Sequence, residues 1–286
     1  MTGLPVLSSG RSMTTWIHGC CEANGIRIRY LRTGGPRPPV VLLHGLTGDG
    51  TCWTPLARAL ESEFDVVMPD ARGHGGSSAP RYGYRYDDHA DDVGGLLRGL
   101  ELVRPVLLGH SMGGMTAAVV ASRGAGILRG LILIDPTFLS PARQREVHAS
   151  DVADQHRRTL GLEKPDFVAE LRARHPRRSP EIIELLAEAR RSTCSAAFHV
   201  LTPPNPEYRD VVSAIDVPTL LVIGDRTIVT LDMALELQSL NPRVRFEQIH
   251  DAGHGLPFDQ PDRLGEVVGS FLRELHERTP SALPSA

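Results

Sequence analysis

The sequence predicts an α/β fold in which a mostly parallel sheet is flanked by helices, and three observations support this. Short apolar runs without polar alternation recur along the chain, which is typical of strands buried on both faces. These runs alternate with stretches of helical spacing. The length of 286 residues is enough to bury one substantial core. The runs are Val40–Leu43, Val66–Met68, Val106–Leu108, Leu131–Ile134, Leu220–Ile223 and the more polar Val244–Ile249.

Both ends of the chain depart from this pattern. Two antiparallel strands are expected around Thr15–Gly19 and Ile26–Leu31, joined through a turn that contains Asn24-Gly25. The ending TPSALPSA favours a disordered tail over residues 279–286. Between the apolar runs, helices are expected at Asp87–Leu100, Met112–Ser122, Leu231–Leu240 and Arg263–Glu277.

The segment that follows the run ending at Asp135 lacks strand-like character. It is rich in arginine and glutamate, prolines divide it, and helical spacing is evident at Pro180–Arg191. We therefore predict a helical cap over residues 138–212, inserted into a core formed by residues 1–137 and 213–278. Caps over binding clefts commonly have this form, although a plain structural excursion would give the same pattern.

Bulk properties exclude several classes of partner. The net charge is −3 and no tract is dense in lysine or arginine, so we expect no nucleic-acid partner and no membrane surface. No segment is long and apolar enough to span a bilayer. The four cysteines form no C-x-x-C pair, which suits reduced thiols in a cytoplasmic protein. We expect a small-molecule substrate, no metal and no cofactor, and leave homo-oligomerisation open.

The sharpest motif is GHSMGG at 109–114, directly after a predicted strand and before a predicted helix. A G-x-S-x-G sequence in this setting places Ser111 on a tight turn as a candidate nucleophile, whereas an ordinary strand–helix turn is the plainer interpretation. A serine needs a base, and His254 lies between two glycines in a late loop that could reach it.

Four segments in order resemble the α/β-hydrolase superfamily, over about Thr33 to Leu275. They are VVLLHGLTGDG (40–50), MPDARGHGGS (68–77), GHSMGG (109–114) and HDAGHGLPFDQP (250–261). The resemblance implies an α/β-hydrolase fold and a cofactor-free catalytic triad with Ser111 as nucleophile and His254 as base. It also implies an oxyanion hole formed by the backbone N–H groups of Leu46 and Met112. The histidines of these motif loops, His44, His74 and His110, are expected to orient backbone through hydrogen bonds.

The acid of this triad has two candidates. In most relatives it comes three residues after a glycine like Gly224, where this chain has Thr227. Asp225 matches a supporting position of that loop, but the loop is one residue short, so a local shift could make Asp225 the acid. Some branches of the superfamily carry the acid one strand earlier, where Asp135 ends LILID. We favour Asp135, with Asp225 as the alternative.

These residues favour a serine hydrolase that cleaves a carboxylic ester or lactone of a medium-sized hydrophobic substrate through an acyl-enzyme. Trp53, Phe138 and Phe198 are candidate pocket walls. Within the superfamily the same triad also serves C–C bond hydrolases and cofactor-free lyases, which is the first alternative. The second is a non-catalytic ligand receptor, for which Thr227 in place of an acid is the best argument. A haloalkane dehalogenase or epoxide hydrolase would need an aspartate at Ser111.

Overall fold

The computed structural model of the chain describes residues 16–124 and 126–277. The expected tail at 279–286 and the predicted strand start at Thr15 lie outside the described residues. Within the described ranges no helix is long and apolar enough to cross a membrane.

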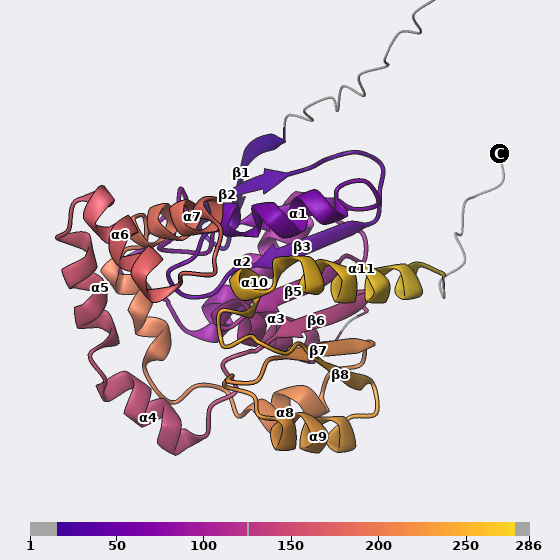
Figure 1. Cartoon of the computed structure of the whole chain (residues 1–286). Coiled ribbons are helices and arrows are strands. Elements are labelled where there is room, and N and C mark those ends of the chain that lie inside the picture. Colours follow the sequence, from indigo (N-terminus) through magenta and orange to yellow (C-terminus); the bar gives the residue numbers. More distant parts are fainter. Residues whose placement is uncertain (1–15, 125, 278–286) are drawn as a thin grey trace, which may run out of the picture.

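An eight-stranded sheet runs through the described residues in the order β1-β2-β4-β3-β5-β6-β7-β8 (Figure 1). Strand β1 pairs antiparallel with β2, and β2 pairs antiparallel with β4. The pairs from β4 through β3 to β8 are all parallel, so the predicted mostly parallel sheet is confirmed. The strands are β1 (Ile17–Ala23), β2 (Ile26–Arg32), β3 (Pro39–Leu43), β4 (Asp65–Pro69), β5 (Val106–His110), β6 (Gly130–Ile134), β7 (Thr219–Ile223) and β8 (Val244–Gln248).

Burial explains why these segments form strands. Every residue of β4, β5, β6 and β7 is buried, as continuous apolar runs at the centre of a sheet require. The more polar β8 is an edge strand with only Val244 buried. In β2, Ile26 and Ile28 are buried while Arg27 between them is exposed, because one face of this hairpin is open to solvent.

Helices cover both faces of the sheet (Figure 1). One apolar cluster joins one face to α1 (Thr54–Leu60) and α11 (Pro261–Glu277). A second cluster joins the opposite face to α2 (Tyr86–Gly99) and α3 (Met112–Ser122), and to the shorter helices beside them. Those shorter helices are α8 (Tyr208–Ser213) and α9 (Leu231–Leu240).

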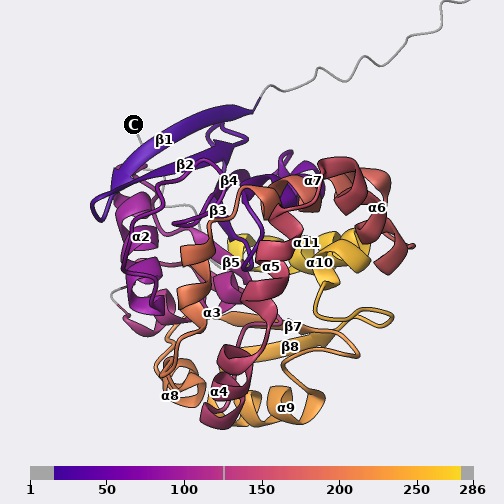
Figure 2. The same ribbon diagram turned by 90° about the vertical axis from the view of Figure 1, so that its left-hand side faces the viewer.

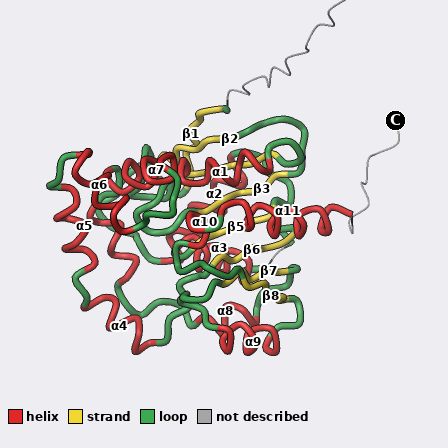
Figure 3. Tube along the Cα trace, in the orientation of Figure 1, coloured by secondary structure: helices red, strands yellow, loops and turns green. Residues whose placement is uncertain are grey.

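The chain between β6 and β7 contains helices and loops but no strand among the described residues (Figure 3). Viewed from the left-hand side of Figure 1, α4 to α7 stand in front of the sheet (Figure 2). Helices α6 and α7 share an apolar cluster of their own around Phe167 and Ile183. The elements in order are α4 (Pro141–Ala149), α5 (Val152–Leu160), α6 (Lys164–Arg174), α7 (Pro180–Arg191) and η2 (Ser195–Leu201).

Several contacts hold these helices over the core, and two of them involve α7 and the loop before it. Helix α7 packs against the short helix η1 (Gly50–Trp53). Between α6 and α7, Arg178 forms an ion pair of 2.8 Å with Asp259 of α10 (Leu256–Asp259). Helix α8 falls mostly within the range 138–212, but it packs against α3 and α9 in the core layer. We use the word cap below for α4 to η2.

Candidate active site

Ser111 occupies a sharp turn between β5 and α3, with φ of 54° and ψ of −117°. A residue other than glycine rarely adopts this conformation, which raises the side chain above the end of the sheet. The turn depends on close backbone approach: a methyl group at Gly113 would lie 2.2 Å from the carbonyl oxygen of Leu43. The N–H of Ser111 donates to the carbonyl of Ile134 at 3.1 Å, which ties the turn to β6.

The structure brings Ser111, His254 and Asp135 together from the loops after β5, β8 and β6. Nε2 of His254 lies 2.9 Å from the hydroxyl oxygen of Ser111, and Nδ1 of His254 lies 2.5 Å from Oδ2 of Asp135. The carboxylate accepts a hydrogen bond from Nδ1–H, so the neutral ring presents Nε2 as an acceptor to the hydroxyl. The side chain of Asp135 is fully buried, whereas that of His254 is 44% exposed.

The loop after β7 donates two backbone hydrogen bonds to the carboxylate of Asp135. The N–H of Val229 donates to Oδ1 at 2.9 Å, and the N–H of Ile228 donates to Oδ2 at 3.1 Å. The hydroxyl of Thr227 donates to the carbonyl of Val229 at 2.8 Å and holds the turn. Both oxygens of the buried carboxylate therefore have donors. Sequence reasoning missed these donors because backbone N–H groups leave no signal in residue type.

Asp225, the alternative acid, lies in the same loop but faces away from His254. It accepts hydrogen bonds from Nδ1 of His250 at 3.0 Å, from the N–H of Asp251 at 2.7 Å and from Gln248 at 3.2 Å. The hydrogen bond from His250, followed by that from Asp251, lowers the pKa of Asp225. Its side chain is 32% exposed. Of the two candidate acids, Asp135 is the one beside His254.

The loop after β3 lies against Ser111. A methyl group at Gly45 would come within 3.2 Å of Cβ of Ser111. His44 holds this loop, since its Nδ1–H donates to the carbonyl of Gly45 at 2.8 Å and its Nε2 accepts the N–H of Ala71 at 2.9 Å. Within the described part of the chain, the N–H groups of Leu46 and Met112 have no acceptor. Both expected oxyanion donors are thus free.

His110, directly before Ser111, holds the loop that carries His254. Its Nε2–H donates to the backbone carbonyl of His254 at 2.7 Å. Burial, with the nearby charge of His254 as the second cause, lowers the pKa of His110 to about 3. His110 is therefore neutral at pH 7 and acts as a fixed hydrogen-bond donor, in agreement with the role expected for it.

Ser111 and His254 open into a cavity of about 270 Å³ between core and cap. Of the three candidate walls, Trp53 lines it. Phe138 and Phe198 do not; Phe138 stacks on Tyr208 instead, with ring centres 5.4 Å apart. The lining combines apolar side chains with cationic ones. The cap contributes the lining residues Leu171, His175, Arg178, Leu186 and Arg190.

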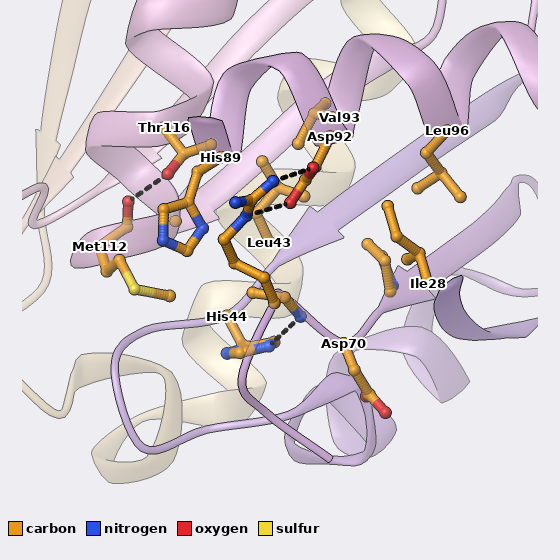
Figure 4. A pocket seen from close by; sticks show the side chains of 14 residues that line it. Ile28, Leu43, His44, Asp70, His89, Asp92, Val93, Leu96, Met112 and Thr116 are labelled. Atoms are coloured by element: carbon orange, nitrogen blue, oxygen red, sulfur yellow. Dashed lines mark hydrogen bonds and ion pairs between the residues drawn. The ribbon is translucent and has the colours of Figure 1, made fainter. Parts of the chain in front are cut away.

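A second cavity, of about 30 Å³, lies beside the end of β3 and is too small for a substrate (Figure 4). Its walls carry an ion pair between Arg72 and Asp92, both buried. Burial lowers the pKa of His89 on the same wall to about 3, so this histidine is neutral. The cavity belongs to the packing that joins α2 to the loop after β4. Among the described residues no cluster of three or more His, Cys, Asp or Glu side chains could hold a metal.

Comparison with known proteins agrees with this architecture. The family described as the alpha/beta hydrolase fold matches residues 38–261. The N-formylmaleamate deformylase of Pseudomonas putida is 32% identical over 273 residues, which cover 91% of this chain and 98% of that protein.

Two solved structures illustrate the chemistry found on this fold. An esterase from Thermogutta terrifontis, with malate bound, has a TM-score of 0.75 and 30% identity, covering 91% of this chain and 99% of its own. An enol-lactonase from Burkholderia xenovorans has a TM-score of 0.73 and 25% identity, covering 89% and 100%. The family match spans most of the chain, as the four sequence segments predicted. The chain therefore belongs to the α/β-hydrolase family.

Proposed function

We propose that the protein is a serine hydrolase that cleaves a carboxylic ester or lactone through an acyl-enzyme. Ser111 is the nucleophile, His254 the general base and acid, and Asp135 the acid that orients His254. The observation that carries the proposal is the continuous hydrogen-bond chain from Asp135 through His254 to Ser111, at 2.5 and 2.9 Å, opening into a cavity.

The chemistry follows from the atoms in place. As the hydroxyl oxygen of Ser111 attacks the carbonyl carbon, His254 takes the hydroxyl proton at Nε2, and the charge of Asp135 stabilises the imidazolium. The oxyanion is bound by the N–H groups of Leu46 and Met112. His254 then protonates the leaving alkoxide as the C–O bond breaks. Water, deprotonated by His254, hydrolyses the acyl-enzyme and restores Ser111.

The esterase and the enol-lactonase support the ester or lactone bond, since both act on C–O acyl bonds by name. A second candidate is the C–N bond of an activated amide, which the 32% identity to a deformylase favours. The steps are the same, except that His254 must protonate a nitrogen leaving group. The receptor hypothesis rested on Thr227 in place of an acid. That argument no longer holds, because a carboxylate oxygen of Asp135 lies 2.5 Å from Nδ1 of His254.

A fluorophosphonate probe tests the proposal, because it reacts with activated serines. We expect stoichiometric labelling of folded protein at Ser111, and none in the Ser111→Ala variant. Turnover is then measured on aryl esters, lactones, N-formyl amides and ring-fission dienones. Labelling with turnover of esters or lactones supports the first candidate, and turnover confined to formyl amides supports the second. Folded protein that is never labelled and hydrolyses no member of the set would overturn the proposal.

A further inference from the structure

We propose that the substrate carries a carboxylate group, and that Arg190 of the cap receives it inside the cavity, with Arg178 as a second positive charge beside His254. The inference rests on the proposed function, because it concerns the same cavity. It replaces the hydrophobic substrate expected from the sequence with an anionic one.

Arg190 is an unpaired cation in the cavity wall. It lies in the last turn of α7, four residues after Leu186, so that both side chains occupy one face of the helix and line the cavity. Its Nε atom is buried without a hydrogen-bond partner. Among the described residues it forms no ion pair, whereas Arg174 and Arg178 nearby pair with Glu170 and Asp259.

An unpaired guanidinium in this position needs an explanation. Burying a charged donor without an acceptor destabilises a protein, and native proteins contain few such groups. Burial, and the repulsion from Arg174, lower the pKa of Arg190. The guanidinium nevertheless remains protonated, because arginine does not titrate in the physiological range. A bound carboxylate would supply the acceptor that the protein itself does not provide.

Arg178 also lines the cavity, and two contacts hold its side chain in place. Its Nε donates to Asp259 at 2.8 Å, and its guanidinium lies over the ring of Phe258, 5.6 Å from the centre. A methyl group at Gly255, next to His254, would come within 2.2 Å of Nη2. The remaining guanidinium N–H groups of Arg178 have no acceptor among the described residues. They are available to an anion that approaches His254.

Arg190 has no acidic partner among the described residues, and Asp259, which pairs with Arg178, does not line the cavity. The cavity lining contains no aspartate and no glutamate. Burial, followed by the charge of Arg178, lowers the pKa of His175 in the lining, so this histidine is neutral at pH 7. Positive charge in a partly desolvated cleft attracts anions, and arginine binds carboxylates with two parallel hydrogen bonds.

The core and the cap contribute different chemistry to the cavity. Ser111 and the oxyanion loop contribute from the core, while Leu171, Leu186 and Arg190 contribute from the cap. A substrate that presents its carbonyl to Ser111 extends towards the cap, where its carboxylate meets Arg190. Monoesters and monoamides of short dicarboxylic acids, and esters of hydroxybenzoic acids, have this form.

The test compares charged substrates with neutral partners of the same shape. One pair places the charge on the acyl group: 4-nitrophenyl hydrogen adipate and its methyl ester. The other places it on the leaving group: 4-acetoxybenzoate and its methyl ester. We expect the unsubstituted protein to prefer the charged member of at least one pair by about 10- to 100-fold in kcat/KM, mainly through KM, the range of a hydrogen bond to a charged group.

Variants assign this preference to Arg190. Arg190→Gln should abolish it and Arg190→Lys should retain part of it. The matched control is Arg172→Gln, which removes the same charge from an exposed position on α6 that does not line this cavity. Thermal unfolding confirms that each variant is folded. A preference for the neutral members, or a preference that Arg190→Gln leaves intact, would overturn the inference.

A binding arm separates this inference from the proposed function. Calorimetric titration of the Ser111→Ala variant with glutarate and adipate needs no turnover. We expect both dicarboxylates to bind, and we expect their Kd to rise at least tenfold in the double variant that also carries Arg190→Gln. If binding follows Arg190 but the unsubstituted protein hydrolyses nothing, the proposed function fails and the anion site stands. If neutral esters are hydrolysed and neither dicarboxylate binds, the anion site fails and the proposed function stands.

Discussion

Replacing Asp135 by asparagine changes one oxygen to an NH₂ group and removes one buried charge. The carboxylate accepts three hydrogen bonds, from Nδ1–H of His254 at 2.5 Å and from the N–H groups of Val229 and Ile228 at 2.9 and 3.1 Å. Asparagine has only one acceptor oxygen. If the NH₂ group faces His254, it stabilises the wrong tautomer, with the proton on Nε2. If it faces Val229, two donors oppose each other in a fully buried site.

The loss in rate can be estimated from the charges. With an effective dielectric constant of about 20 and about 4 Å between charge centres, the carboxylate attracts the imidazolium by about 4 kcal/mol. This corresponds to about a thousandfold in rate, because each 1.36 kcal/mol is about tenfold. The unfavourable tautomer lowers the rate further, so kcat of Asp135→Asn should fall about 10³- to 10⁴-fold. The unmet hydrogen bond should lower the free energy of unfolding by about 1 to 3 kcal/mol.

Asp225→Asn is the matched control, since it makes the same substitution in the same group of loops. Asp225 contacts Gln248, His250 and Asp251, none of which belongs to the proposed triad. We expect kcat within a few-fold of the unsubstituted protein. Turnover of a 4-nitrophenyl ester measures both variants, and urea unfolding verifies that they are folded. Near-normal turnover of Asp135→Asn together with collapse in Asp225→Asn would refute the assignment of the acid.

Two further predictions concern the residues that position the site. His110→Gln keeps a donor for the carbonyl of His254 but cannot be protonated. In the unsubstituted protein His110 binds a proton below about pH 6.5 when the chain is unfolded, but not when it is folded and the histidine is buried. The free energy of unfolding of the unsubstituted protein therefore decreases as the pH is lowered. Its stability relative to His110→Gln, measured by urea unfolding, should drop by about 1 to 2 kcal/mol between pH 7 and pH 5, and a constant difference would contradict this. Gly113→Ala places a methyl group 2.2 Å from the carbonyl oxygen of Leu43 and should cost about 1 to 3 kcal/mol with about a hundredfold loss of kcat. Gly94→Ala, where the methyl group finds space beside a flexible side chain, is the control, and equal behaviour of the two variants would show that the turn does not need Gly113.

Much of the fold could be predicted because its signals are local. Buried strands require continuous apolar runs, and β5, β6 and β7 lie where those runs predicted. Helix α7 begins at Pro180, behind the N-cap Ser179, and ends at Arg191, as its spacing indicated. The extent of the core layer was harder to predict, since α8 differs from the cap helices only in which partners it packs against.

At the site, side chains at strand ends could be predicted and backbone geometry could not. Parallel strands bring their carboxyl ends to one edge, which brings the loops of Ser111 and His254 together. The choice between Asp135 and Asp225 depended on where each carboxylate points, a property of the loop conformation. The cations of the cavity were also missed: Arg190 is one arginine among many in the sequence, and only folding reveals that it has no partner.

The formation of a covalent acyl group on Ser111 tests the central claim most directly. The protein is mixed with a 4-nitrophenyl ester, quenched in acid within the first turnover, and digested for mass spectrometry. The account predicts a mass increase of one acyl group on the peptide that carries Ser111, absent from Ser111→Ala and accumulating together with a burst of 4-nitrophenol. Turnover that proceeds with no acyl group on Ser111, or that persists at an undiminished rate in Ser111→Ala, would contradict it.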